Sequence, residues 1–212
     1  MRRAVNIINL AVIIAVLGFT TVSFTSKEAS QEAPVKEKRV SHRGIYITAY
    51  TAQARTRFEY LKRQCKLAGI DTLVIDAKEI LSRRYVEMAR QRQLSPGTRA
   101  EASPWLSKLA AELQAEGFIV TARIVVLKDD HLVLARPDLG VHLNGGLYRD
   151  RKGGKWADPY SDEVRLYNTL IAESAALSGV DEIQFDYIRF PAEGSAGSAT
   201  YPHLKEGVSK VD

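Results

Sequence analysis

From Gly44 onward, short runs typical of β-strands alternate with longer amphipathic runs typical of α-helices. Strict alternation at this spacing favours parallel strands joined by right-handed crossovers. Two architectures satisfy it, an open doubly wound sheet and a (β/α)8 barrel. The predicted strands are 44–50, 72–76, 119–126 and 182–187, and the predicted helices are 56–68, 103–116 and 161–177.

Local signals support the helix boundaries. Ser103 suits an N-cap and Pro104 suits the first helical turn, where its missing N–H costs nothing. Gly69, Gly117 and Gly179 follow the three predicted helices, at the position where glycine relieves left-handed strain. The connections after the second and third strands are about 25 and 35 residues long, which exceeds ordinary loops and indicates functional insertions.

The two faces of the predicted strands differ in polarity, and this difference decides between the two architectures. Strands covered by helices on both faces read as nearly continuous apolar runs. A polar second face instead indicates a barrel interior. We therefore expect an α/β fold, a (β/α)8 TIM barrel of which the first four βα units are present. Alternate positions of a strand share one face, and we call each such set a parity. The apolar parity consists of Ile45, Ile47, Leu73, Ile75, Ala122, Ile124, Ile183 and Phe185. The polar parity consists of Tyr46, Thr48, Tyr50, Asp76, Lys78, Thr121, Arg123, Gln184 and Asp186.

The N-terminal segment does not belong to this fold. Arg2 and Arg3 precede an apolar run at 7–24, the arrangement of a secretory signal or a membrane anchor. We expect residues 1–26 to be an uncleaved anchor, because 22–26 is a poor cleavage site. Residues 27–43 are charged and lack apolar periodicity, which predicts a flexible stalk. The domain at 44–212 is then extracytoplasmic, membrane-anchored or secreted.

Charge and cysteine content exclude several classes of function. The first 43 residues hold 7 Lys or Arg and 3 Asp or Glu, which leaves 23 basic and 22 acidic residues for the remainder. A nearly neutral domain does not suggest a nucleic-acid partner, and the basic N-terminal segment needs only a membrane surface. Cys65 is the single cysteine, so it forms no intrachain disulfide, and its helical spacing with Phe58 and Leu61 predicts a buried thiol.

Asp186 is the candidate catalytic residue, as nucleophile or base. It ends the fourth predicted strand on the polar parity, and catalytic groups of barrels lie at the carboxyl ends of strands. Such a carboxylate needs a cation or hydroxyl within reach to stay ionised and oriented. Arg189 and Tyr187 follow it directly, although a surface or loop-carbonyl contact explains Arg189 equally well. Arg123 lies mid-strand and is better explained as a structural ion-pair partner inside the barrel.

Asp76 and Lys78 end the second strand and are candidate substrate-binding residues that pair with each other. A solvated strand end explains them equally well. The run 128–131 resembles a metal cluster, but no other ligands follow at fixed spacing, so we expect a loop and no metal.

Trp156 lies between Tyr148 and Tyr160 in the loop before the third helix. Aromatic faces suit the apolar face of a pyranose, so a sugar-binding platform is one interpretation, and simple loop packing is the other. The glycines at 145–146 and 153–154 match neither the dinucleotide fingerprint nor the phosphate loop. We expect no cofactor.

Five runs resemble the glycoside hydrolase-like family of bacterial envelope proteins formerly known as a domain of unknown function. They are GIYITAY at 44–50, TLVIDAK at 72–78, ARIVV at 122–126, WADPY at 156–160 and IQFDYIRFP at 183–191. The resemblance implies a TIM barrel, a carbohydrate substrate and Asp186 at the nucleophile position of related retaining enzymes.

Retaining hydrolysis also needs a second carboxyl group about 5 to 5.5 Å away. In such relatives it comes from a later strand, and the chain ends soon after the fourth. Only Asp76 or Glu193 would serve in its place. The leading hypothesis is hydrolysis of O-glycosyl bonds in an extracytoplasmic polysaccharide, with the chain possessing activity only if the second carboxyl is supplied.

Two other hypotheses stay open. A non-catalytic carbohydrate-binding or scaffold domain of the cell envelope needs aromatic platforms and polar rims but no acid/base pair. An α/β hydrolase acting on another wall component is less favoured, because no Gly-x-Ser-x-Gly elbow is present in the sequence.

Overall fold

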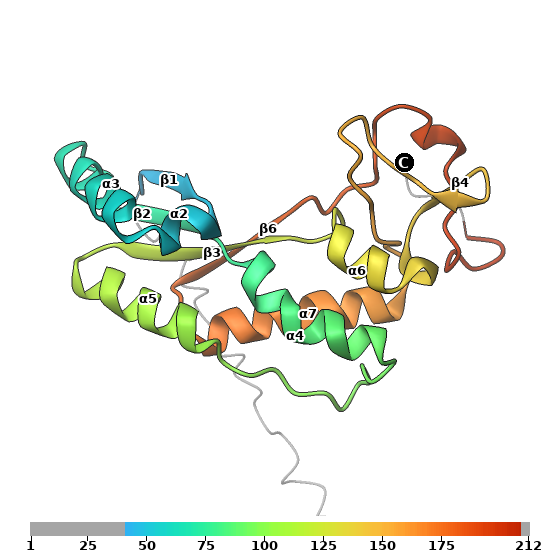
Figure 1. The fold of residues 1–212 in the computed structure, drawn as a ribbon, viewed down its shortest axis with the longest axis horizontal. Coiled ribbons are helices and arrows are strands. Elements are labelled where there is room, and N and C mark those ends of the chain that lie inside the picture. The colour runs from blue at the N-terminus through green and yellow to red at the C-terminus, as the bar shows by residue number, and fades with distance from the viewer. Residues whose placement is uncertain (1–40, 209–212) are drawn as a thin grey trace, which may run out of the picture. The chain divides into compact units, whose positions relative to one another are not determined.

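The computed structural model describes residues 41–208. They form four strands of one sheet, a short hairpin and a set of helices (Figure 1). The elements are β1 (Gly44–Ile47), α2 (Ala49–Gln53), α3 (Arg55–Leu67), β2 (Thr72–Asp76), α4 (Lys78–Arg90), α5 (Pro104–Ala115), β3 (Ile119–Val125), α6 (Asp130–Ala135), η1 (Pro137–Leu139), β4 (His142–Leu143), β5 (Gly146–Leu147), α7 (Asp162–Leu177), β6 (Glu182–Asp186) and η2 (Ala196–Ser198).

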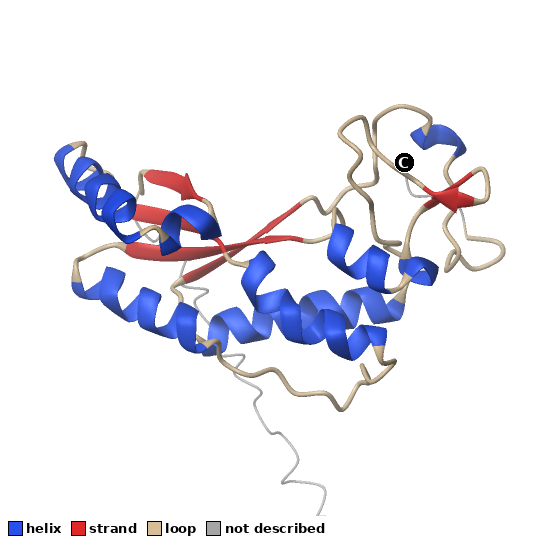
Figure 2. Ribbon diagram, in the orientation of Figure 1, coloured by secondary structure: helices blue, strands red, loops and turns tan. Residues whose placement is uncertain are grey.

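The main sheet is parallel, with the order β1-β2-β3-β6. Each strand therefore pairs with the next strand of the sheet along the chain, and the order does not reverse as it does in a doubly wound sheet. Helices α4, α5 and α7 lie together on one side of β3 and β6 (Figure 2). The expected α/β class with a parallel sheet is confirmed.

Two apolar clusters join the sheet to its helices. One contains Ile47, Leu73 and Val120 from the strands, packed against α3 and α5. The other contains Ile124 with Tyr85 from α4 and Tyr167 from α7. These strand residues all have the parity predicted to be apolar, so the buried face of β1, β2 and β3 was identified correctly. Phe185 of β6 was predicted on the same face but is 49% exposed, because β6 is an edge strand. Lone Cys65 is buried in the first cluster, as expected, and its burial raises the pKa of the thiol.

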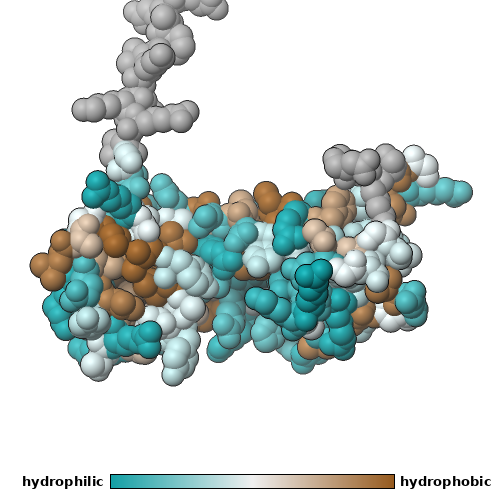
Figure 3. Space-filling model, turned by 90° about the horizontal axis from the view of Figure 1, so that it is seen from above, coloured by the Kyte–Doolittle hydropathy of each residue, from teal (hydrophilic) through white to brown (hydrophobic). Residues whose placement is uncertain are grey.

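The opposite face of the sheet bears Tyr46, Val74, Arg123 and Gln184, which line a pocket along it. No described element packs over this pocket in the way that the helices cover the other face. Seen from above, hydrophobic residues gather at the end of the molecule that holds β1, β2 and α3 (Figure 3).

The first strand is shorter than predicted. It ends at Ile47, because the Thr48 hydroxyl accepts a hydrogen bond from the Thr51 amide and caps helix α2. Thr48 and Tyr50 therefore do not extend the polar face of the sheet. Tyr50 instead lies on α2 with 81% of its surface exposed.

The predicted long loop after the second strand was wrong. Helix α4 begins at Lys78, two residues after β2 ends, and buries Leu81, Tyr85 and Ala89. These residues recur every four positions and form one helical stripe. The irregular part of this connection is confined to residues 91–103.

The connection after β3 is long, as expected, but much of it is ordered. It holds α6, η1 and the hairpin of β4 and β5. The run 128–131, predicted as a loop, lies only half in one, since helix α6 begins at Asp130. The Ser103 cap, the Pro104 start and the positive φ of Gly69, Gly117 and Gly179 agree with prediction.

The predicted anchor at 1–26 lies outside the described residues, as does all but the last part of the predicted stalk. Of that stalk, His42 and the Arg43 amide contact the Asp71 carboxylate beside β2. None of the helices in residues 41–208 has the length and apolar character needed to cross a membrane.

Candidate functional site

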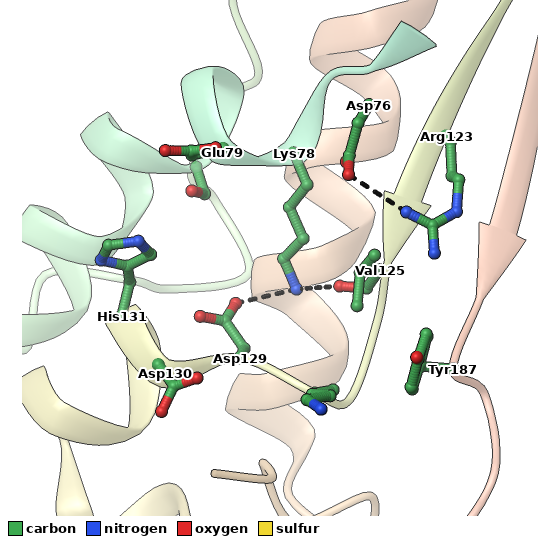
Figure 4. A pocket seen from close by; sticks show the side chains of 11 residues that line it. Asp76, Lys78, Glu79, Arg123, Val125, Asp129, Asp130, His131 and Tyr187 are labelled. Atoms are coloured by element: carbon green, nitrogen blue, oxygen red, sulfur yellow. Dashed lines mark hydrogen bonds and ion pairs between the residues drawn. The ribbon is translucent and has the colours of Figure 1, made fainter. Parts of the chain in front are cut away.

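A pocket of about 340 Å³ lies at the carboxyl ends of β2, β3 and β6 (Figure 4). Parallel strands bring their carboxyl ends to one edge, so residues distant in sequence meet there. The lining is rich in charge on every side. It consists of Asp76, Lys78, Glu79, Ser82, Arg123, Val125, Lys128, Asp129, Asp130, His131 and Tyr187.

Arg123 connects the carboxylates of two neighbouring strands. Its Nη1 donates to Asp76 Oδ2 at 3.1 Å, and its Nε and Nη2 donate to Asp186 Oδ2 at 2.9 and 2.5 Å. Tyr46 donates its hydroxyl to Asp76 Oδ2 at 2.7 Å, and its ring centroid lies 5.1 Å from the guanidinium carbon. The register explains this meeting, because Asp76 pairs with Arg123 across β2 and β3.

This network holds Asp186 ionised. Burial raises the pKa of Asp186, but the hydrogen bonds and positive charge of Arg123 outweigh burial and place that pKa below its ordinary value. Burial and the hydrogen bond to Asp76 raise the pKa of Tyr46 to about 12, so its hydroxyl stays protonated at neutral pH. The site therefore presents an anionic Asp186 and a neutral donor on Tyr46.

The backbone after Asp186 is adapted to the same carboxylate. Tyr187 has a φ of 54°, a left-handed conformation that few residues other than glycine adopt. Its amide donates to Asp186 Oδ1 at 2.6 Å. Asp186 thus accepts hydrogen bonds on both oxygens, and its orientation is fixed from two sides.

Lys78 does not pair with Asp76, in contrast to the prediction. Because it begins α4, its side chain turns into the protein, where Nζ lies 2.8 Å from Asp129 Oδ2. It also donates to Asn168 Oδ1 and to the carbonyl oxygens of Val125 and Val126. Burial lowers the pKa of Lys78, and the charge of Asp129 only partly offsets this effect.

Two further ion pairs involve charged groups of the pocket lining. Lys128 Nζ lies 2.6 Å from Asp150 Oδ2, and Lys155 Nζ lies 2.8 Å from Asp130 Oδ1. Within residues 41–208 no group of three or more His, Cys, Asp or Glu residues is arranged to hold a metal ion.

Of the two interpretations of Trp156, a sugar-binding platform or loop packing, its burial agrees with loop packing. Only 2% of Trp156 is exposed, and its indole N–H donates to Asp150, so the ring packs inside the loop. Tyr148 is equally buried. The ring of Trp156 instead supports Tyr187, at a centroid distance of 5.6 Å, and Arg189, whose guanidinium carbon lies 5.1 Å away.

A family model described as "Putative glycosyl hydrolase domain" matches residues 44–212. The chain belongs to this family. The match takes in all four strands of the main sheet and each residue of the Arg123 network.

Two solved structures are similar to this member of the glycosyl hydrolase-like family. A hypothetical protein from Ruminiclostridium thermocellum ATCC 27405 is 27% identical with a TM-score of 0.60, and the match covers 78% of this chain and 84% of that one. An alpha-galactosidase from Lactobacillus brevis is 14% identical with a TM-score of 0.43, covering 68% of this chain and 20% of that one. No curated protein sequence matches the chain.

Several pocket residues of this family member were missed in the sequence. Glu79 points into the pocket from the first turn of α4, and Asp130 and His131 reach it from α6 (Figure 4). The stripe of Leu81, Tyr85 and Ala89 was a readable signal for α4 and hence for Glu79. No comparable signal places α6, which depends on the long connection folding back over the sheet edge.

Proposed function

We propose that this chain is a glycoside hydrolase in which Asp186 is the reacting carboxylate, as nucleophile or base, on an extracytoplasmic polysaccharide. One observation carries the proposal. The guanidinium of Arg123 hydrogen-bonds to both Asp76 and Asp186 at the carboxyl edge of the sheet. Oxocarbenium-like transition states need a fixed negative charge beneath the anomeric carbon. Family membership supports the same reaction class.

The residues around Asp186 take supporting roles in this proposal. Arg123 keeps the carboxylate ionised and oriented, and the Tyr187 amide holds its second oxygen. Asp76 Oδ2 is already engaged, whereas Oδ1 accepts no hydrogen bond from residues 41–208. We assign Asp76 Oδ1 to a sugar hydroxyl. Lys78, which is buried and fully bonded, fixes the end of β3 instead of contacting sugar.

The architecture that suits this chemistry is a TIM barrel. The strands follow one another in order, all parallel, and their polar face lies opposite the described helices. Closing a barrel would pair further strands with the edges of β1 and β6 and turn Tyr46, Arg123 and Asp186 toward a common interior. We propose that the general acid comes from such a strand.

Substitution of Asp186 tests the assignment. The change Asp186→Asn keeps the shape of the site and removes the charge, so turnover should fall by about three orders of magnitude or more while sugar binding survives. The matched control is Glu182→Gln, at the opposite end of the same strand, where Glu182 contacts Thr121. Initial rates on a panel of envelope polysaccharides and aryl glycosides provide the measurement.

Undiminished hydrolysis by the Asn variant would remove Asp186 from the mechanism. Sugar binding without hydrolysis in the unsubstituted full chain would favour the carbohydrate-binding domain instead.

We further propose that residues 1–26 tether the domain to a membrane on its extracytoplasmic side. The support is Arg2 and Arg3 followed by the apolar run at 7–24. The full chain should sediment with membranes, and deletion of residues 1–26 should release it to the soluble fraction. Recovery of the intact chain in the cytosol contradicts this proposal.

A further inference from the structure

Arg189 stands out among the cations near the site because no acidic partner contacts it within residues 41–208. Its guanidinium carbon lies 5.1 Å from the Trp156 ring centroid and 5.5 Å from that of Tyr187. One N–H donates to the Phe190 carbonyl oxygen at 3.1 Å. No carboxylate in residues 41–208 lies within ion-pair distance, and the side chain is exposed.

The other cations around the pocket are all neutralised. Lys78 pairs with Asp129, Lys128 with Asp150 and Lys155 with Asp130, while Arg123 carries both Asp76 and Asp186. A guanidinium has five N–H donors, so Arg189 retains four for a ligand. Contact with two aromatic rings restricts the motion of the guanidinium, which reduces the entropy lost when a planar anion binds.

The position of Arg189 relates it to the proposed reaction centre. Its charge helps to lower the pKa of Asp186, after burial and Arg123, so the two side chains are electrostatic neighbours. Tyr187, which it contacts, lines the pocket on the side opposite Glu79 and His131 (Figure 4). Arg189 is not itself part of the pocket lining and lies behind Tyr187, which it contacts.

We propose that Arg189 is a specificity residue that binds an anionic substituent of the glycan, namely the carboxylate of a uronic acid residue. Bidentate hydrogen bonding to a planar carboxylate is the recognition for which a pre-oriented guanidinium is best suited. The inference rests on the proposed function, since it concerns the substrate of the same site. Sulfate and phosphate esters share part of this chemistry and are separated by the test.

The test measures binding to the full chain carrying Asp186→Asn, which prevents turnover. The probes are hexuronate oligosaccharides and the same oligosaccharides after reduction of their carboxyl groups to alcohols. Adding Arg189→Gln should weaken binding of the acidic form by about 10- to 100-fold and leave the reduced form within twofold. Arg189→Lys should give a smaller loss, because lysine keeps the charge but lacks the planar fork.

The matched control is Arg57→Gln, an exposed arginine on α3 that lies outside the pocket lining. It should change neither affinity. Thermal melts of each variant separate a folding defect from a binding defect. Sulfated and phosphorylated oligosaccharides form additional arms, and tighter binding of either would overturn the assignment to a carboxylate.

The inference fails if the unsubstituted protein does not prefer the acidic over the reduced form, or if Arg189→Gln weakens both equally. In the chain that retains Asp186, a fall in kcat on Arg189→Gln with unchanged charge preference would likewise overturn it and make Arg189 a support for Asp186. The outcome is separable from the proposed function. Charge-selective binding without hydrolysis would contradict only the hydrolase proposal, and hydrolysis without charge preference would contradict only this inference.

Discussion

Arg123 shows how one residue can organise a site from the middle of a strand. Its side chain lies on the uncovered face of the sheet and reaches carboxylates on both neighbouring strands. Two anions facing one cation leave a net charge of −1, which suits stabilisation of a cationic transition state. Mid-strand position alone suggested a structural ion pair, and the geometry shows that the same contact also orients Asp186.

Asp150 is a residue whose titration should affect stability. Its side chain accepts hydrogen bonds from the amides of Lys152 and Gly154, from the Trp156 indole and from Lys128. Burial raises its pKa, but these donors lower the pKa to about 2. The folded state thus binds this proton less readily than the unfolded state, where the pKa is about 3.9. Its stabilising effect is complete above that value and disappears as pH falls toward 2.

Asp150→Asn tests this linkage. The free energy of unfolding of the variant should lie below that of the unsubstituted protein at pH 6, and the difference should shrink by about 2 kcal/mol as pH falls from 5 to 2. Denaturant titrations across that range give the values. Glu173→Gln, on the exposed side of α7, serves as the control and should show a difference that does not vary with pH. A pH-independent difference for the Asn variant would contradict the ionic role of Asp150.

At the scale of elements, the sequence predicted what depends on local periodicity. The parity of the strands placed Tyr46, Asp76, Arg123 and Asp186 on one face, and the hydrogen bonds among them confirm it. Helix α4 was missed because Ala77 supplies no side-chain cap and no glycine separates the helix from β2. That error also misplaced Lys78, since a side chain at the start of a helix does not continue the alternation of the strand.

Whether the loop aromatics are buried or exposed depends on contacts that the periodicity of the sequence does not encode. Trp156 is buried because Asp150 binds its indole N–H and because the connection folds back to pair Trp156 with Lys128, just after β3. Neither partner lies at a regular spacing from it. Composition indicates a platform and loop packing equally, and only the three-dimensional arrangement distinguishes them.

Gly140 tests how tightly the connection between β3 and α7 is packed. A Cβ added there would lie 2.7 Å from side-chain atoms of Leu147 and Val133 and 3.2 Å from the Pro137 carbonyl oxygen. Gly140→Ala should therefore destabilise the protein by about 1–3 kcal/mol through overpacking. Gly197→Ala is the matched control, because no atom lies within 4 Å of its added Cβ. Chemical denaturation of both variants provides the comparison, and equal stabilities would show that the connection packs loosely.

In the whole molecule, helices cover one face of the main sheet, and the described residues leave its other face and its two edge strands uncovered. Strands β1 and β6 form the edges of the main sheet. Beside the β6 edge, 49% of Phe185 and 69% of Ile188 are exposed, and 50% of Tyr46 is exposed on β1. Unpaired parallel edges with apolar neighbours are templates for further strands.

Self-association should therefore accompany the isolated domain. Residues 27–212 should form dimers or larger species in light scattering coupled to size-exclusion chromatography, because pairing of β6 with β1 of a second copy would satisfy both edges. Phe185→Lys places a charge beside the β6 edge and should shift the population toward monomer. Leu134→Lys, on α6 with Leu134 60% exposed, removes an apolar side chain away from the edges and should leave the population unchanged. A monomer that unfolds cooperatively at all concentrations would mean that the edges are protected in some other way, and it would count against the proposed barrel.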